Sequence, residues 1–219
     1  MRDTIQSLAG GNKIVYILLS IFLLNVTYPI SELGAVAALL YVGFYLVLTG
    51  SAIYLVSSDR TLLIFSIVLG IFIAVFGGIT IASDFTAGWA QILWNASLLI
   101  QVLMIITLLT LFIIQSDKVT SEVLFAAIAI YFLSAGLFSI TYVVIETVSP
   151  NAFVSSSEAE ITWQSLNYFS LVTITTLGYG DIIPTISTTQ SLSALQASIG
   201  TLYIAILIGR FVSLYQNEG

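Results

Sequence analysis

The 219-residue sequence contains no cysteine and no histidine, and only 7% of its residues are charged. Without cysteine there is no disulfide and no thiolate metal site, and without histidine there is no imidazole base or ligand. A soluble domain carries about 25% charged residues, so a surface this poor in charge does not face water. The net charge of −6 argues against a nucleic-acid partner. The composition predicts a polytopic membrane protein whose main partner is lipid.

Long apolar runs are abundant, and hydrophobic residues make up 58% of the chain. Six runs have roughly the length that an α-helix needs to cross a bilayer. Short polar joints interrupt them, among them Pro29-Ile30-Ser31 and residues 57–60 and 115–118. We therefore predict an all-α membrane protein with six transmembrane helices, at residues 13–28, 33–56, 61–82, 88–114, 119–148 and 187–215.

The basic residues provide an independent check on the orientation of these helices. With six spans and both termini on one side, all five basic residues fall on that side, and the positive-inside rule makes it the cytoplasm. They are Arg2, Lys13, Arg60, Lys118 and Arg210.

A polar stretch and a short apolar segment lie between the last two runs. Residues 149–160 predict an exposed loop, the turret, in which Ser157 and Glu160 have the spacing of a capping box. Residues 161–175 are too few to span a membrane, so we predict a re-entrant pore helix buried among protein.

The run T-L-G-Y-G-D follows at residues 176–181. Two glycines around an aromatic residue allow the backbone dihedrals that turn successive carbonyl groups to one side. The run resembles the selectivity filter of potassium channels, and the resemblance is close over residues 165–211. The resemblance implies K⁺ as the permeant ion, bound by rings of carbonyl oxygen from Thr176, Leu177, Gly178 and Tyr179. Gly180 is the last of the five ion-binding filter residues that it implies. Because such a pore needs four filters and this chain has one, it implies a homotetramer.

The resemblance also assigns supporting residues. In related channels an aspartate at the position of Asp181 accepts a hydrogen bond from an aromatic donor thirteen residues earlier, here Tyr168. Val172 stands where some bacterial channels have a buried glutamate that pairs with the aspartate, so one support of the filter is missing here. Leu177 replaces the valine that is commoner in the family. Glu146 either faces the rear of the filter or reaches for water at the interface.

Two glycines of the last helix are candidates for a gating hinge. Gly200 lies nineteen residues after Asp181, as does the inner-helix hinge of simple bacterial potassium channels. The alternative is that Gly200 only allows close helix packing, as small residues do in membranes. Gly209 is the second candidate, with packing at a bundle crossing as its alternative.

Residues 1–118 form a four-helix module ahead of a pore domain at residues 119–219. Voltage sensing needs about 3–4 gating charges per subunit, yet residues 88–114 and 62–82 contain no Lys or Arg. We therefore expect no strong voltage gating. The polar residues of the fourth helix, Gln91, Asn95 and Gln101, are expected to hydrogen-bond between helices. Only four residues follow Tyr215, so gating is assigned to the filter, the membrane or an unseen regulatory partner.

Two alternatives to a potassium-selective channel stay open. One is a non-selective cation channel. The other is an intramembrane aspartyl protease with the pattern G-x-G-D, whose chemistry needs a second aspartate within the membrane. The remaining aspartates, at helix ends, in loops or in the tail, are Asp3, Asp59, Asp84 and Asp117. The sequence thus predicts a channel without enzymatic activity or cofactor, in the plasma membrane of a prokaryote.

Overall fold

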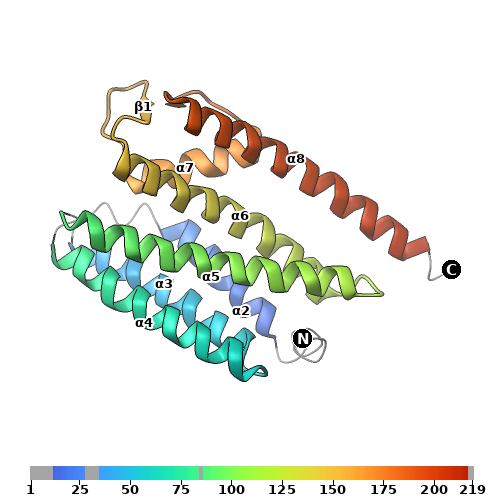
Figure 1. Ribbon diagram of the computed structural model, residues 1–219. Helices are drawn as coiled ribbons and strands as arrows, with labels where there is room; N and C mark the ends of the chain where they lie inside the picture. Colours follow the sequence, from blue (N-terminus) through green and yellow to red (C-terminus); the bar gives the residue numbers. More distant parts are fainter. Residues whose placement is uncertain (1–11, 28–34, 84–85, 217–219) are drawn as a thin grey trace. The chain divides into compact units, whose positions relative to one another are not determined.

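The computed structural model of the chain describes residues 12–27, 35–83 and 86–216 (Figure 1). These ranges contain seven helices and two short strands, so the protein is mostly helical. Contacts divide it into two compact units, which are described separately below. Residues 1–116 and 120–130 form the first unit, and residues 117–119 and 131–219 form the second.

Four helices make up most of the first unit, and consecutive helices lie side by side (Figure 1). Their bounds fall within two residues of the predicted apolar runs at every described end, because length and polar joints limit each run. The predicted break at Pro29-Ile30-Ser31 lies outside the described residues, as does Arg2. The helices are α2 (Lys13–Thr27), α3 (Ala35–Leu55), α4 (Arg60–Ala82) and α5 (Gly88–Gln115).

Charged side chains mark the joint between α3 and α4. Asp59 is the N-cap of α4, and its carboxylate accepts hydrogen bonds from the backbone amides of Thr61 and Leu62 at 3.0 and 3.2 Å. The ammonium group of Lys13 donates to the carbonyl oxygen of Leu55 at 3.5 Å. A cation at the carboxyl end of α3 is stabilised by the partial negative charge of the helix terminus. These contacts place the start of α2 beside the joint between α3 and α4.

Polar side chains join the helices inside this unit. The hydroxyl oxygens of Ser20 and Ser51 lie 2.8 Å apart, between α2 and α3. Thr49 on α3 donates to the side-chain oxygen of Gln101 on α5 at 3.3 Å. The predicted hydrogen bonding of Gln101 between helices is therefore confirmed. In a membrane such bonds hold helices together where the hydrophobic effect between them is weak.

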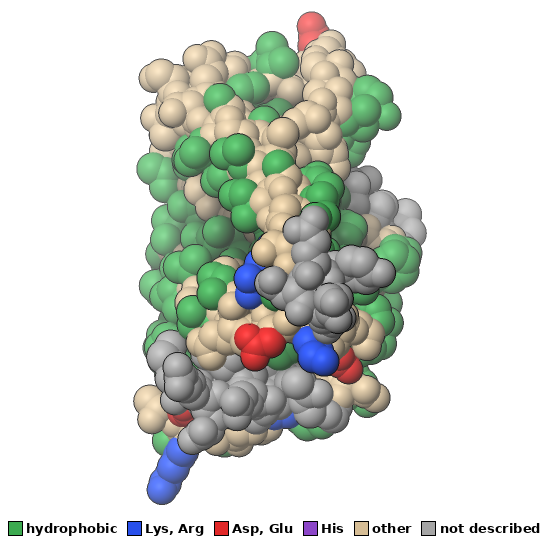
Figure 2. Space-filling model, turned by 90° about the vertical axis from the view of Figure 1, so that its right-hand side faces the viewer, with side chains coloured by type: hydrophobic (Ala, Val, Ile, Leu, Met, Phe, Trp, Pro, Cys, Tyr) green, Lys and Arg blue, Asp and Glu red, His purple; other side chains and the backbone are tan. Residues whose placement is uncertain are grey.

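The protein is a membrane protein. Within the described residues, four helices are long and apolar enough to cross a bilayer: α4, α5, α6 (Ser121–Val148) and α8 (Ser187–Gln216), the last over Ser187–Leu214. Two shorter apolar stretches are α2 and residues 43–55 of α3. Exposed apolar side chains are frequent, and the face shown in Figure 2 carries many hydrophobic and few charged groups. Side chains of this kind are suited to lipid contact.

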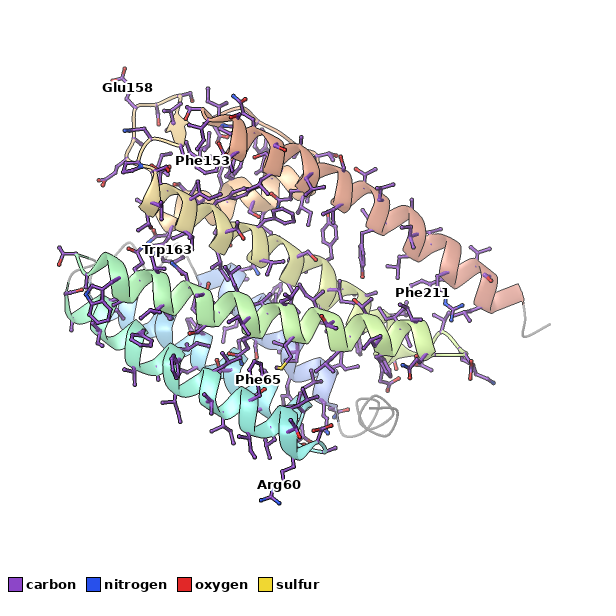
Figure 3. All side chains as sticks on the ribbon, viewed as in Figure 1. Arg60, Phe65, Phe153, Glu158, Trp163 and Phe211 are labelled. Carbon is purple, nitrogen blue, oxygen red and sulfur yellow. The ribbon has the colours of Figure 1, made fainter. Side chains whose placement is uncertain are left out.

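The second unit contains most of α6, the pore helix α7 (Trp163–Ile174) and α8. The twelve residues of α7 extend only about 18 Å, too short for a hydrocarbon core of about 30 Å. Glu158 in the turret lies at one end of this unit, and Phe211 lies toward the opposite end of α8 (Figure 3).

The start of α7 differs from the prediction. Its N-cap is Thr162, whose hydroxyl accepts from the amide of Ser165 at 3.2 Å while the Ser165 hydroxyl accepts from the amide of Thr162 at 2.9 Å. The predicted capping box at Ser157 and Glu160 is therefore wrong. Ser157 bonds with Ser155 within the turret, where the hydroxyl oxygens lie 2.9 Å apart.

Two strands of three residues, which an all-α prediction does not include, tie the turret to the segment after residue 181. β1 (Phe153–Ser155) pairs antiparallel with β2 (Ile182–Pro184), and Val154 lies opposite Ile183. Ala152 and Phe153 are fully buried, so the turret is not exposed throughout as expected. The core beneath the strands is formed by Tyr142, Ala152, Phe153, Leu166, Phe169 and Ile182.

Candidate functional site

The segment between α7 and β2 has an alternating backbone conformation. The φ angle is +58° at Thr176, +56° at Gly178 and +78° at Gly180, whereas Leu177 and Tyr179 have negative φ. Glycine reaches such positive φ angles without steric penalty, and Thr176 holds one despite its β-branch. Alternating left- and right-handed residues turn successive amides to one side of the strand and successive carbonyl oxygens to the other.

Hydrogen bonds fix which side faces α7. The amide of Thr176 donates to the carbonyl of Thr173 at 3.0 Å. The amides of Leu177 and Gly178 both donate to the carbonyl of Val172, at 3.0 and 3.4 Å. The amides at the base of the segment therefore point back to the pore helix. By the alternation described above, the carbonyl oxygens of the segment are directed away from α7.

The pore helix adds an electrostatic contribution at this base. α7 ends at Ile174, so its carboxyl terminus directly precedes the segment. A helix carries about half a negative charge at that end. This partial charge would stabilise a dehydrated cation placed beside Thr175 and Thr176.

The alternating segment lies on the surface of the single chain. All residues from Thr175 to Gly180 are exposed, and the large side chains of Leu177 and Tyr179 are 55% and 66% exposed. The segment and its two large side chains are thus left uncovered within the single chain.

Asp181 anchors the outer end of the segment. Its carboxylate accepts a hydrogen bond from the phenol of Tyr168 at 2.7 Å and one from the amide of Ile182 at 3.1 Å. Its backbone carbonyl accepts from the amide of Ser156 at 2.8 Å. The aspartate thus joins the pore helix, the start of β2 and the turret, and the contact with Tyr168 is the one that the thirteen-residue spacing predicts.

Glu146 contacts the turret backbone. One carboxylate oxygen accepts from the amide of Asn151 at 2.7 Å, and the other accepts from the amide of Phe153 at 3.1 Å. Neither of the two sequence interpretations includes this contact with the turret backbone. The carboxylate instead closes the turn between α6 and β1.

Comparison with known proteins agrees with this geometry. Residues 118–217 match the family model described as an ion channel. A segment of 46 residues is 48% identical to Two-pore potassium channel 4 of Arabidopsis thaliana, and it covers 21% of this chain and 16% of the plant protein. Together these two matches support a relationship of residues 118–217 to the potassium channel superfamily. No solved structure matches the chain.

Gly200 lies against the end of the pore helix. A Cβ atom at Gly200 would overlap the carbonyl oxygen of Ile174 and come within 2.9 Å of its side chain. Helix α8 continues unbroken past this residue. Gly200 therefore allows α8 to pack closely against α7. Close packing was the alternative to a hinge at this residue. Gly209 has no atom within 4 Å of an added Cβ in the single chain.

The remaining candidates for chemistry are dispersed. Within the described residues no three or more His, Cys, Asp or Glu side chains gather into a metal site. Asp59 caps α4, and Asp3 and Asp84 lie outside the described residues. An ion channel family indicates a protein that is not an enzyme.

Sequence analysis missed two polar residues behind the filter, Gln196 and Ser170. Both are fully buried in the second unit. A glutamine within the apolar run of a membrane helix was the available signal, because such a side chain usually faces protein and hydrogen-bonds there.

Proposed function

We propose that the chain forms a potassium-selective channel that passes K⁺ down its gradient without catalysis or cofactor. The observation that carries the proposal is the alternation of φ at residues 176–180, with the amides of the base held by α7. The carbonyl oxygens of Thr176, Leu177, Gly178 and Tyr179 then replace the hydration shell of K⁺. Tyr168 and Asp181 hold the outer end of this filter.

The channel is a homotetramer in this proposal. One chain supplies one filter strand, and the strand is exposed along its length. Potassium channels generally form oligomers, and four copies around one axis complete rings of carbonyl oxygen. Three identical neighbours also cover the side chains of Leu177 and Tyr179.

Six membrane spans place both termini in the cytoplasm. Four helices have the length and composition of membrane spans. In this proposal α2 and α3 are the fifth and sixth spans. The contact of Lys13 with the joint before Arg60 supports a common side for these two basic residues. The positive-inside rule makes that side cytoplasmic, and we assign the channel to the plasma membrane of a prokaryote.

The four-helix module does not act as a strong voltage sensor. α5 contains no basic residue, and Arg60 at the start of α4 is the one basic residue of that helix. Moving one charge through 100 mV provides only about 2.3 kcal/mol. Gating is therefore controlled by the filter, by the membrane or by a regulatory partner.

Flux from reconstituted vesicles tests the proposal. Vesicles that contain the purified protein and are loaded with KCl are expected to release K⁺ down an outward K⁺ gradient without any added potassium ionophore. External barium is expected to block that release. Vesicles loaded with NaCl are expected to release Na⁺ poorly. Equal rates for the two ions would favour the non-selective channel, and absence of any flux would refute the proposal.

A further inference from the structure

A buried chain of hydrogen bonds connects α6, α7 and α8 behind the filter. The phenol of Tyr142 on α6 donates to the side-chain oxygen of Gln196 on α8 at 2.7 Å. The side-chain nitrogen of Gln196 donates to the carbonyl and hydroxyl oxygens of Ser170 on α7, at 3.0 and 2.6 Å. The hydroxyl of Ser170 donates to the carbonyl of Ala135, again on α6, at 2.6 Å. We call these contacts the Gln196 network.

The direction of every hydrogen bond in the network is determined. The carbonyl oxygens of Ser170 and Ala135 can only accept, so the amide nitrogen of Gln196 faces Ser170 and the Ser170 hydroxyl donates to Ala135. The remaining amide oxygen of Gln196 then accepts from Tyr142. Each side-chain hydrogen has one acceptor, and the side chains of Tyr142, Ser170 and Gln196 are fully buried. Polar groups so placed are expensive to leave unpaired.

A second set of contacts lies one helical turn further along. Ile174 follows Ser170 by four residues, and Gly200 follows Gln196 by four, so each pair shares a helix face. The phenol of Tyr131, one turn before Ala135 on α6, donates to the carbonyl of Ile174 at 3.1 Å. Gly200 packs against that same carbonyl. The pore helix is thus held between α6 and α8 at two successive levels.

We propose that Gln196 is a positioning residue for ion conduction, which fixes the pore helix and thereby the filter through the Gln196 network. This inference rests on the proposed function. The filter amides bond to Val172 and Thr173, two and three residues after Ser170 on α7. A shift of α7 therefore moves the carbonyl oxygens that bind K⁺.

Single-channel recording at low and high external K⁺ tests this role. Gln196→Leu keeps the bulk of the side chain and removes the oxygen and nitrogen atoms that bond to Tyr142 and Ser170. With it the open probability is expected to fall about tenfold in low external K⁺, because buried hydrogen bonds of this kind are lost. High external K⁺ is expected to restore it, since bound ions stabilise the filter. A merely structural defect would lower the yield of tetramer and leave the K⁺ dependence of the remaining channels unchanged.

Two further variants keep the test independent of folding. Tyr142→Phe removes one hydroxyl and retains the ring packing against Phe153 and Phe169, so it is expected to fold and to share the K⁺-dependent defect. Thr141→Val is the matched control. The hydroxyl of Thr141 bonds only to the carbonyl of Leu137 in its own helix, at 2.8 Å. The control is expected to behave as the unmodified channel.

A double-mutant cycle completes the experiment. If Tyr142 acts through Gln196, the combined variant is expected to be no worse than Gln196→Leu alone. Additive effects, or a Gln196→Leu channel indistinguishable from Thr141→Val, would overturn the inference. A failure of the proposed function is recognised separately, because the unmodified protein would then conduct no K⁺ at all.

Discussion

The phenolic oxygen of Tyr168 lies 2.7 Å from a carboxylate oxygen of Asp181, and this contact joins the pore helix to the outer end of the filter. A hydrogen bond to a charged acceptor contributes about 1.5–3 kcal/mol. The amide of Ile182 donates to the other carboxylate oxygen. The carboxylate is therefore held between α7 and the start of β2.

Removing this hydrogen bond is expected to destabilise the open filter. In Tyr168→Phe the ring remains but the donor is lost, so we expect macroscopic current to decay about tenfold faster. Patch recording of reconstituted channels measures this. Tyr168→Trp retains an N–H donor and is the matched control, which is expected to decay slowly. Equal decay in both variants would show that the bond does not support the filter.

The positive φ of Gly178 leads to a second prediction. A residue with a Cβ loses roughly 1–2 kcal/mol in the left-handed region, and a tetramer contains four copies. Gly178→Ala is therefore expected to abolish selective K⁺ flux from vesicles. Gly136→Ala, on α6 with no atom near an added Cβ, is expected to conduct normally. Normal selectivity in Gly178→Ala would contradict the carbonyl-ring interpretation.

Gly200 distinguishes packing from hinge motion. Because a Cβ there overlaps the carbonyl of Ile174, Gly200→Ala forces α8 away from α7. Overpacking of this kind destabilises by about 1–3 kcal/mol, so the thermal stability of the purified channel is expected to fall. Gly209→Ala is expected to retain it. A Gly200→Ala channel of unchanged stability but reduced opening would instead support the hinge.

Glu146 is expected to hold the turret closed. Its two oxygens accept from the amides of Asn151 and Phe153, and a glutamine side chain has only one acceptor oxygen. In Glu146→Gln only one of the two amides keeps an acceptor, so hydrogen exchange at the other is expected to accelerate by about tenfold or more, since a hydrogen bond to a charged group contributes about 1.5–3 kcal/mol. Glu158→Gln, at an exposed turret position, is the control. Unchanged exchange in Glu146→Gln would refute this role.

The sequence was sufficient for the helices and for the contact of Tyr168 with Asp181, but not for the parts that depend on distant partners. Apolar runs end at polar joints, so the helices could be placed within two residues at their described ends. β1 and β2 have only three residues each, and they form because Val154 meets Ile183 far along the chain. No local pattern reveals such a pair.

The same limit applies to the cap of α7 and to Gln196. The predicted pair, Ser157 with Glu160, has the same spacing as the observed pair, Thr162 with Ser165, and Ser157 instead bonds with Ser155 in the folded turret. Gln196 meets partners 54 and 26 residues away, at Tyr142 and Ser170. The Gly200 contact likewise depends on how α8 crosses α7.

The bi-ionic reversal potential in planar bilayers tests the central claim most directly. With KCl on one side and NaCl on the other, a filter built from the carbonyl groups of residues 176–179 is expected to give a reversal potential set by K⁺ alone. Substitution of Rb⁺, an ion of similar size, for Na⁺ is expected to bring it close to zero. A reversal potential near zero with Na⁺ itself would contradict potassium selectivity.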